Sequence, residues 1–241
     1  MNDVRTIIQE LLFAFYLKLG TFLGFNGGRF PSVFLAARLK IIDEPIVIDV
    51  GCNVGDFVDL IASISHKPRV YCFDIQETFG DMLKKNHPDL NIFFCHVALS
   101  DKPGVSKFFS NSKTDRKAHL VSQDMSQGTS EEVVVSTLDR EVARLGINRV
   151  DVLKIDTEGF DFEVLRGAKK TLGFTQTVIF EIMFRTLERG VHPNDYLAYL
   201  SSHGFNYFYR CTAFLGLHRI LKIDPWHLST QTLVASRNPI R

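Results

Sequence analysis

Short runs of β-branched and other hydrophobic residues recur along the middle of the chain, and each is followed by a turn and an amphipathic stretch. The clearest run, Ile-Val-Ile-Asp-Val at residues 46–50, leads into two glycines, Gly51 and Gly55. Such a run is typical of a parallel strand covered on both faces, where apolar and polar residues need not alternate. Comparable runs predict strands at 69–73, 91–96, 150–155 and 177–182, and helical spacing of apolar residues predicts a helix within 54–65. The pattern predicts an α/β domain built on a mostly parallel sheet.

The remaining segments predict smaller elements around this core. Expected are helices over 138–145, from Gly159 onward and over 194–202, a hairpin arm at 105–109, and a closing antiparallel pair from 206–210 and 232–235. Residues 110–132 are rich in Ser, Thr, Lys, Asp and Gln, so we expect a long loop there. Loops of this length in compact domains are usually functional or disordered. Both a substrate lid and a plain surface insertion fit this composition.

Residues 4–25 have apolar side chains spaced for one face of a helix. Arg5, Glu10 and Lys18 interrupt them, so the segment falls short of the roughly 18 apolar residues that a membrane-spanning helix requires. One interpretation is a helix packed on the domain or on a second subunit, which would make a homodimer. The other is an interfacial helix that contacts a membrane or a lipid-linked substrate. We therefore divide the chain into a helical appendage, residues 1–40, and a main domain, residues 41–241.

Composition limits the classes of protein that the chain can represent. Its 241 residues, 45% of them hydrophobic, suffice for one α/β domain with a full core. The formal net charge of +1 argues against nucleic acid as the main partner. The four cysteines form no C-x-x-C pair, which favours buried thiols in a reducing compartment over a disulfide or metal role. We therefore expect a cytoplasmic protein, which residues 4–25 would bring to the membrane periphery if they form an interfacial helix.

The turn at residues 51–55 carries the first chemical signal. Glycine lets the backbone bend sharply and lets a ligand approach where a Cβ atom would block it. A dinucleotide motif requires G-x-G-x-x-G, but Asn53 and Asp56 occupy its later glycine positions, and no Gly-Lys-Ser/Thr follows for a P-loop. The next strand is followed by Asp74, about 20 residues beyond the turn, where an acidic side chain accepts hydrogen bonds from ribose hydroxyls. These features favour a ligand with a ribose and no phosphate, such as S-adenosylmethionine, although Asp74 would also serve as a helix cap.

Side chains at the ends of the later strands extend this signal. Ala98 follows the third strand, and the small and apolar residues around it would accommodate an adenine ring. Lys154, Asp156 and Glu158 alternate, so they face one side if the extended form persists. Glu181, near the end of the fifth strand, would add a third carboxylate at the same edge of the sheet. Because burying such groups is costly, they form either an ion-pair network that holds the strand end or a site for ligand and substrate chemistry.

Five motifs, in this order, resemble those of a known family. They are Val-Ile-Asp-Val-Gly-Cys-Asn-Val-Gly at 47–55, Val-Ala-Leu-Ser-Asp at 97–101, Ser-Thr-Leu-Asp at 136–139, Leu-Lys-Ile-Asp-Thr-Glu-Gly at 153–159 with Glu-Val-Leu-Arg-Gly-Ala at 163–168, and the late strand with Glu181. Over about residues 45–185 the chain is similar to the FkbM family of S-adenosylmethionine-dependent methyltransferases. The resemblance implies a class I methyltransferase fold, a Rossmann-like sheet of seven mostly parallel strands with one antiparallel edge strand and helices on both faces. It also implies methylation, usually of a hydroxyl oxygen on a sugar, a glycan or a natural product.

The residue patterns and the resemblance together assign roles. The expected contacts of S-adenosyl-L-methionine are Asp49, Gly51, Asn53, Gly55, Asp74, Ile75, Ala98 and Asp156, the last of these holding its ammonium group. The family more often has Glu-Pro where this chain has Asp74-Ile75, and the shorter acid can still bind ribose. Glu158 and Glu181 are the candidates for a catalytic base, and Lys154 would tune them or orient the acceptor. No histidine spacing indicates a metal, and the competing interpretation is a non-catalytic cofactor-binding or scaffold protein that keeps the fold.

Overall fold

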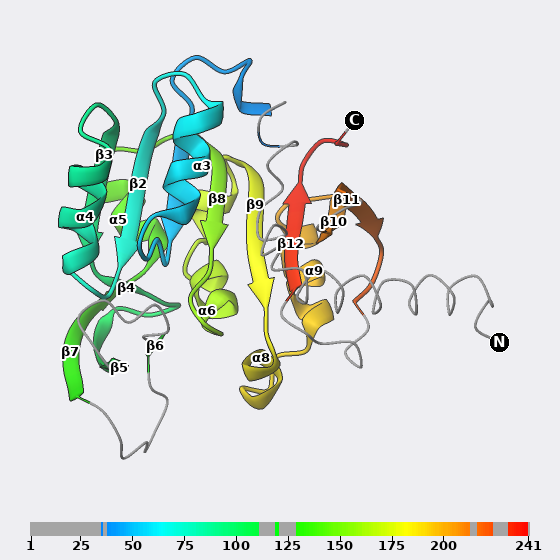
Figure 1. Ribbon diagram of the computed structural model, residues 1–241. Coiled ribbons are helices and arrows are strands. Elements are labelled where there is room, and N and C mark those ends of the chain that lie inside the picture. The colour runs from blue at the N-terminus through cyan, green and yellow to red at the C-terminus, as the bar shows by residue number, and fades with distance from the viewer. Residues whose placement is uncertain are drawn as a thin grey trace, which may run out of the picture.

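The computed structural model of the protein describes residues 35, 38–110, 119–120, 129–212, 216–223 and 231–240. The predicted helix at 4–25 and nearly all of the predicted appendage lie outside this part of the chain. Most of the polar stretch at 110–132 lies outside it as well, so its two interpretations stay predictions. The described residues form a large sheet with helices on both faces and a smaller sheet beside it (Figure 1).

The large sheet has eight described strands in the order β11-β10-β12-β9-β8-β1-β2-β3. Their bounds are β1 (Ile46–Val50), β2 (Arg69–Asp74), β3 (Asn91–His96), β8 (Val150–Ile155), β9 (Thr175–Ile182), β10 (Tyr207–Thr212), β11 (Gly216–Ile220) and β12 (Gln231–Ser236). The strands from β9 to β3 are parallel neighbours, whereas β12 is antiparallel to both β9 and β10, and β11 is antiparallel to β10. The predicted mostly parallel sheet with an antiparallel edge is confirmed, and it has one strand more than the seven expected.

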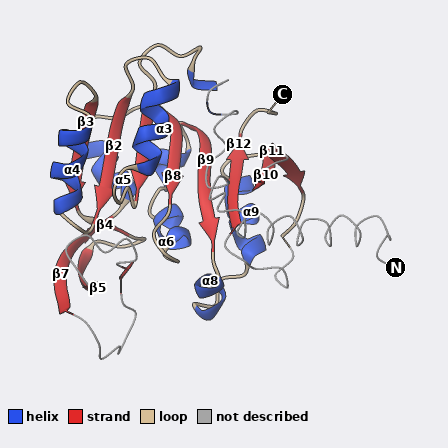
Figure 2. Cartoon of the chain, in the orientation of Figure 1, coloured by secondary structure: helices blue, strands red, loops and turns tan. Residues whose placement is uncertain are grey.

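Helices cover both faces of this sheet, as Figure 2 shows. Their bounds are α3 (Asp56–Ile64), α4 (Thr78–Asn86), α5 (Leu138–Arg144), α6 (Asp161–Arg166), α7 (Lys169–Leu172), α8 (Phe184–Glu188) and α9 (Pro193–Ser202). Side chains alternate across a strand, so Val47 packs in the cluster that contains α3 and α4 residues, and Ile48 in the cluster of α5, α6, α7 and α9. This double coverage explains why β1 has no polar face and why its sequence is an almost continuous apolar run.

A second sheet, in the order β4-β7-β5-β6, follows β3 in the chain. It comprises β4 (Ala98–Leu99), β5 (Gly104–Ser110), β6 (His119–Leu120) and β7 (Thr129–Ser136). The prediction of a loop at 110–132 is therefore wrong for residues 110, 119–120 and 129–132. In β7 the backbone of Thr129 to Glu132 pairs with residues 107–110 of β5. Backbone pairing with a neighbour sustains the strand although its side chains are polar, which a hydrophobic pattern does not detect.

The other predicted elements agree with the structure apart from their ends. The helix expected from Gly159 onward begins at Asp161, because the residues before it form a tight turn. The four cysteines are free thiols, and those of Cys52 and Cys72 are buried. Among the residues that the structure describes, no helix is long and apolar enough to cross a membrane.

Candidate active site

The turn between β1 and α3 adopts left-handed backbone conformations at three positions: φ is +73° at Gly51, +52° at Asn53 and +98° at Gly55. The glycines also have a structural role in the fold. A Cβ atom on Gly51 would lie 1.9 Å from the Asp156 carbonyl oxygen, and one on Gly55 would lie 2.4 Å from Leu83 Cδ2. These glycines are required because β8 and α4 pack directly against the turn. Contact of these two glycines with a cofactor stays a prediction, and it would be made by their backbone atoms.

Asp74, at the end of β2, ties this turn to the second strand. Its Oδ2 accepts a hydrogen bond from the Asn53 backbone N–H at 2.9 Å, and its Oδ1 accepts one from the Gln76 N–H at 3.0 Å. Asn53 tolerates its left-handed conformation because its own Oδ1 accepts from the Val54 N–H. Burial raises the pKa of the Asp74 carboxyl to about 6. Asp74 does not cap α4, which begins at Thr78 after its N-cap residue Glu77, so the capping interpretation is wrong. The remaining lone pairs of its carboxylate leave the ribose contact as a prediction.

Lys154 lies almost fully buried between two carboxylates. Its Nζ lies 2.8 Å from the Gly51 carbonyl oxygen, 3.0 Å from Asp49 Oδ1 and 3.5 Å from Asp156 Oδ2. Burial by itself would lower the pKa of this ammonium, but the carboxylates of Asp49 and Asp156 raise it above its usual range. The ammonium therefore donates a hydrogen bond to the Gly51 carbonyl and forms ion pairs with two carboxylates. This geometry supports the ion-pair interpretation for Lys154, and its catalytic role stays a prediction.

The turn after β8 reverses the chain within a few residues. Glu158 has φ +55° and Gly159 has φ +104°, so two successive residues are left-handed. The extended form expected for Lys154, Asp156 and Glu158 therefore ends before Glu158. A non-glycine residue in this conformation is costly and persists only where its surroundings hold it. Asp161 supplies one such constraint, because its carboxylate accepts hydrogen bonds from the Thr157 N–H and Oγ1 at 3.2 and 2.9 Å.

Glu181 follows on the neighbouring strand β9, where it is half-buried. Its Oε1 accepts a hydrogen bond from Thr232 Oγ1 of β12 at 3.2 Å. Burial and the carboxylates of Asp156 and Glu158 raise the pKa of Glu181 to about 7, against an opposing effect of Lys154. These electrostatic effects operate because Asp156, Glu158 and Glu181 lie at one edge of the sheet, which we call the acidic rim. The predicted convergence of the three carboxylates is thus present.

A small apolar core lies at the small sheet. Ala98 belongs to a buried cluster with Phe108, Val133 and Val135, and Ile75 and Phe160 pack against it. The Arg189 guanidinium lies over the Phe160 ring, 3.7 Å from its centroid, and its Nη2 lies 2.6 Å from Glu163 Oε1. Ala98 thus packs inside the protein, and the adenine contacts expected for Ala98 and Ile75 stay predictions.

Two of the family-like motifs have structural roles outside this region. Asp139 accepts hydrogen bonds from the backbone N–H groups of Lys170 and Thr171 and from Thr171 Oγ1, and so holds the start of α7. Gly167 lies so close to another segment that a Cβ atom would sit 2.1 Å from the Ser100 carbonyl oxygen. These motifs therefore maintain the packing of α5, α6 and α7.

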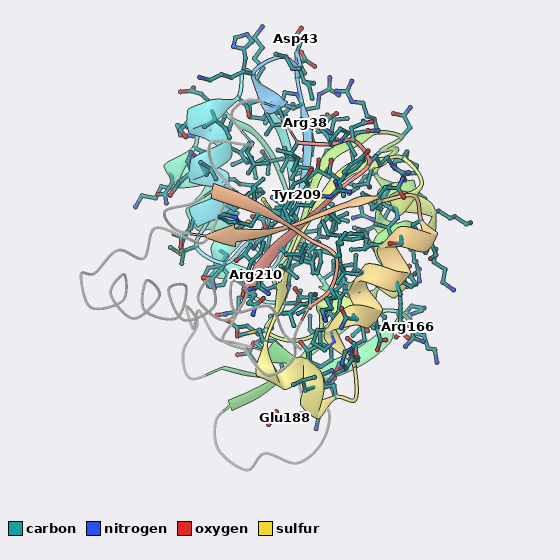
Figure 3. The ribbon with its side chains drawn as sticks, turned by 90° about the vertical axis from the view of Figure 1, so that its right-hand side faces the viewer. Arg38, Asp43, Arg166, Glu188, Tyr209 and Arg210 are labelled. Atoms are coloured by element: carbon teal, nitrogen blue, oxygen red, sulfur yellow. The ribbon has the colours of Figure 1, made fainter. Side chains whose placement is uncertain are left out.

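The predicted site residues come together because β9, β8, β1 and β2 are adjacent and parallel, so their carboxyl ends lie at one edge of the sheet (Figure 1). In Figure 3, Asp43, which precedes β1, and Glu188, which follows β9, lie at opposite ends of the molecule. Asp161 was not among the predicted site residues. It is an acidic residue three positions after Glu158, and this closeness to the predicted carboxylates was the signal that the sequence offered. Within the described ranges, no three His, Cys, Asp or Glu side chains are placed to hold one metal ion.

This sheet order, with a glycine turn after β1 and an acidic residue at the end of β2, defines a class I methyltransferase fold. The chain belongs to the methyltransferase FkbM domain family, which matches residues 49–207. The predicted family is thus confirmed, and with it a methyltransferase whose cofactor is S-adenosylmethionine.

Several characterised proteins are similar to the chain. The 2-O-methyltransferase NoeI of Sinorhizobium fredii is 24% identical over 80% of this chain and 87% of its own length. The hexuronic acid methyltransferase AglP of Haloferax volcanii is 26% identical over 66% of this chain and 62% of its own. Among solved structures, a TehB-like S-adenosylmethionine-dependent methyltransferase of Corynebacterium glutamicum is 11% identical, with a TM-score of 0.45 over 96% of this chain and 99% of that one. An rRNA methylase of Streptococcus thermophilus is 14% identical, with a TM-score of 0.47 over 86% and 94%.

Proposed function

We propose that the protein transfers a methyl group from S-adenosylmethionine to a hydroxyl oxygen of a sugar, a glycan or a related small molecule. The observation that carries this proposal is the Glu181 carboxyl, half-buried at the acidic rim with its pKa raised to about 7. A base with a pKa near the working pH is suited to removing the proton of a hydroxyl group. The names of NoeI and AglP, a 2-O-methyltransferase and a hexuronic acid methyltransferase, support an oxygen and a sugar as the acceptor.

The residues of the turn and of the neighbouring strand ends fit this cofactor. Asp74 would accept hydrogen bonds from the ribose hydroxyls, and Asp156 would pair with the ammonium of the methionine part. Asp49, Gly51, Asn53 and Gly55 would form the wall beside that part, and Ile75 and Ala98 would contact the adenine. Lys154 neutralises Asp49 and part of the charge on Asp156, which leaves the rim with a net negative charge. Such a rim is favourable for a cationic cofactor.

When bound, the cofactor supplies a methyl group made electrophilic by a sulfonium. The protein must then hold the acceptor oxygen in line and exclude water. Glu181 would accept the proton of the hydroxyl group, with Glu158 as the second candidate base. Thr232 donates a hydrogen bond to Glu181 Oε1 and so fixes the orientation of the carboxylate. Lys154, which is buried and paired with Asp49 and Asp156, would keep Asp156 in place and contribute a fixed positive charge.

The decisive experiment compares Glu181→Gln and Glu158→Gln. Binding of S-adenosylhomocysteine is measured by calorimetry, and methyl transfer to a panel of methyl glycosides is measured as release of S-adenosylhomocysteine. We expect the variant of the true base to keep its affinity within about threefold and to lose about 10²–10⁴-fold in turnover. Glu141→Gln is a matched control. This buried glutamate lies on α5 and accepts hydrogen bonds from Ser136 of β7 and Arg144 of α5, neither of which belongs to the acidic rim. Equal losses of binding and turnover in both rim variants would contradict a base at these positions.

The same assay tests the competing proposal of a non-catalytic cofactor-binding or scaffold protein. Such a protein would show no methyl transfer to any acceptor, whether or not it binds S-adenosylhomocysteine. We also propose residues 41–241 as the methyltransferase domain. An N-terminal helix that contacts a second subunit, a membrane or a lipid-linked acceptor stays a prediction for residues 4–25, and a cytoplasmic location stays one for the whole chain.

A further inference from the structure

Asp161 joins the turn at Thr157 to Glu181, a residue that lies 20 positions after Asp161 in the chain. Its Oδ2 accepts hydrogen bonds from the N–H and Oγ1 of Thr157, and its Oδ1 accepts one from the Glu181 N–H at 3.2 Å. The side chain is almost completely buried, with 1% of its surface exposed. Because one carboxylate serves both segments, a change at Asp161 affects both of them.

The position of these bonds in the sheet explains their importance. β8 and β9 pair in register as far as Ile155 and Phe180. Glu181 follows the last paired residue of β9, and Thr157 lies two residues beyond Ile155, the last residue of β8. The Asp156 N–H in between donates to the Val50 carbonyl of β1. The Asp161 carboxylate therefore bridges β8 and β9 at the point where their own ladder ends.

The bridged segments carry both candidate bases. Glu158 follows Thr157 directly and has a left-handed backbone, a conformation that the surrounding structure must impose. Glu181 belongs to the second segment, where its side chain accepts from Thr232. The separation of the two glutamates thus depends on the connection between the turn and β9. Asp161 provides that connection through three hydrogen bonds.

We propose that Asp161 is a positioning residue, which fixes Glu158 and Glu181 relative to each other by tying the turn after β8 to the end of β9. Its effect on turnover rests on the proposed function. Asp161 acts through the two glutamates, because its carboxylate is buried and bonded to Thr157 and the Glu181 backbone. Its loss should therefore impair catalysis more than binding of the cofactor.

Asp161→Asn is the test, and Asp139→Asn is its matched control. Asp139 also accepts hydrogen bonds from two backbone N–H groups and one threonine hydroxyl, but it does so at α7. Each substitution keeps the size of the side chain and replaces an acceptor oxygen with a donor NH₂. Both variants therefore lose comparable local bonds, and only Asp161→Asn loses them at the acidic rim.

The first measurement follows the backbone amide signals of Thr157 and Glu181 by NMR as the pH changes. Burial and the Asp156 carboxylate raise the pKa of Asp161 to about 8, and the hydroxyl of Tyr196 on α9 also interacts with it. The Glu181 carboxyl, whose pKa is raised to about 7, titrates beside the Glu181 amide in all three proteins, so only a transition near pH 8 that both amides share is assigned to Asp161. In the wild type, both amides should show a shared transition near pH 8. Asp161→Asn should lack this transition, and Asp139→Asn should keep it. Amides that titrate independently in the wild type would overturn the proposed bridge.

The second measurement compares turnover with cofactor affinity. A displacement of about 1 Å in a reacting group can cost about 10²-fold in rate, so we expect a loss of this order in kcat for Asp161→Asn. Affinity for S-adenosylhomocysteine should stay within about threefold, and Asp139→Asn should keep its kcat below its melting temperature. Equal kcat losses in the two variants, or parallel losses of kcat and affinity, would overturn the positioning role.

The two measurements also separate this proposal from the proposed function. If the wild type releases no S-adenosylhomocysteine with the methyl glycosides, the proposed function fails for these acceptors. The amide titrations then decide by themselves whether Asp161 bridges the two strand ends. If the wild type is active and the amides respond as expected, the change in kcat decides whether the bridge matters for methyl transfer.

Discussion

Gly51→Ala tests the packing of the glycine turn most directly. An alanine there would have to keep a φ of +73° and place its Cβ 1.9 Å from the Asp156 carbonyl oxygen. The left-handed conformation costs an alanine about 1–2 kcal/mol. Relief of the clash costs about 1–3 kcal/mol more, because the neighbour is backbone and must shift. We therefore expect the free energy of unfolding to fall by about 2–5 kcal/mol.

Gly146→Ala separates these two contributions. Gly146 has a φ of +68°, but an added Cβ would meet nothing within 4 Å. The free energy of unfolding of Gly146→Ala should therefore fall only by the cost of the left-handed conformation, about 1–2 kcal/mol. The assay is urea unfolding of both variants and the wild type, with the midpoint and slope recorded for each. For a chain of this size, a loss of 1 kcal/mol lowers the melting temperature by about 2–4 °C. The melting temperature should therefore fall further in Gly51→Ala than in Gly146→Ala.

Cofactor binding provides a second measure of the same variant. The shift forced on the Asp156 carbonyl would move the carboxylate that we expect to bind the cofactor ammonium. Gly51→Ala should therefore weaken binding of S-adenosylhomocysteine, whereas Gly146→Ala should leave it unchanged in calorimetry. Equal destabilisation of the two variants, or unchanged binding in Gly51→Ala, would refute the close approach of β8 to the turn.

Three further predictions follow from the buried charges. Lys154→Met should leave Asp49 buried without its cation and cost about 3–5 kcal/mol in urea unfolding, whereas Arg69→Met, at an ion pair with Glu44 that is exposed on both sides, should leave the free energy of unfolding nearly unchanged. Similar costs for the two would contradict a tight internal pair. Asp74→Ala should weaken S-adenosylmethionine binding at least about tenfold, because hydrogen bonds to a charged group contribute about 1.5–3 kcal/mol each; unchanged calorimetric affinity would rule out the ribose contact. The pKa of Asp161 is raised from 3.8 to about 8 by burial and by Asp156, so its contribution to stability is complete below about pH 4 and is lost as the pH rises to 8. Urea unfolding between pH 5 and 8 should therefore show a smaller fall in stability for Asp161→Asn than for the wild type, and an equal fall would argue against the raised pKa.

Much of the core could be predicted from the sequence, because strand and helix patterns are local. The apolar run at residues 46–50 and the glycines after it located β1 and the turn, and left-handed backbone at Gly51 and Gly55 is what glycine permits. The strand ends at Asp74 and Ile155 also followed from local pattern. Polar strands were less predictable, since residues 129–132 form a strand through backbone pairing that their side chains do not reveal.

The sequence by itself determined which chemical groups stand at the carboxyl ends of the strands, and hence the family and the cofactor. Only the tertiary structure decided how these groups are used, because their partners are distant in the chain. Residue 51 must be glycine because a Cβ atom there would clash with the Asp156 carbonyl oxygen. The ammonium of Lys154 bonds to the Gly51 carbonyl and pairs with Asp49 and Asp156. Asp161 joins Thr157 to Glu181 only because β8 and β9 lie side by side. Residue type and spacing are local properties, whereas these contacts exist only after the strands have assembled into one sheet.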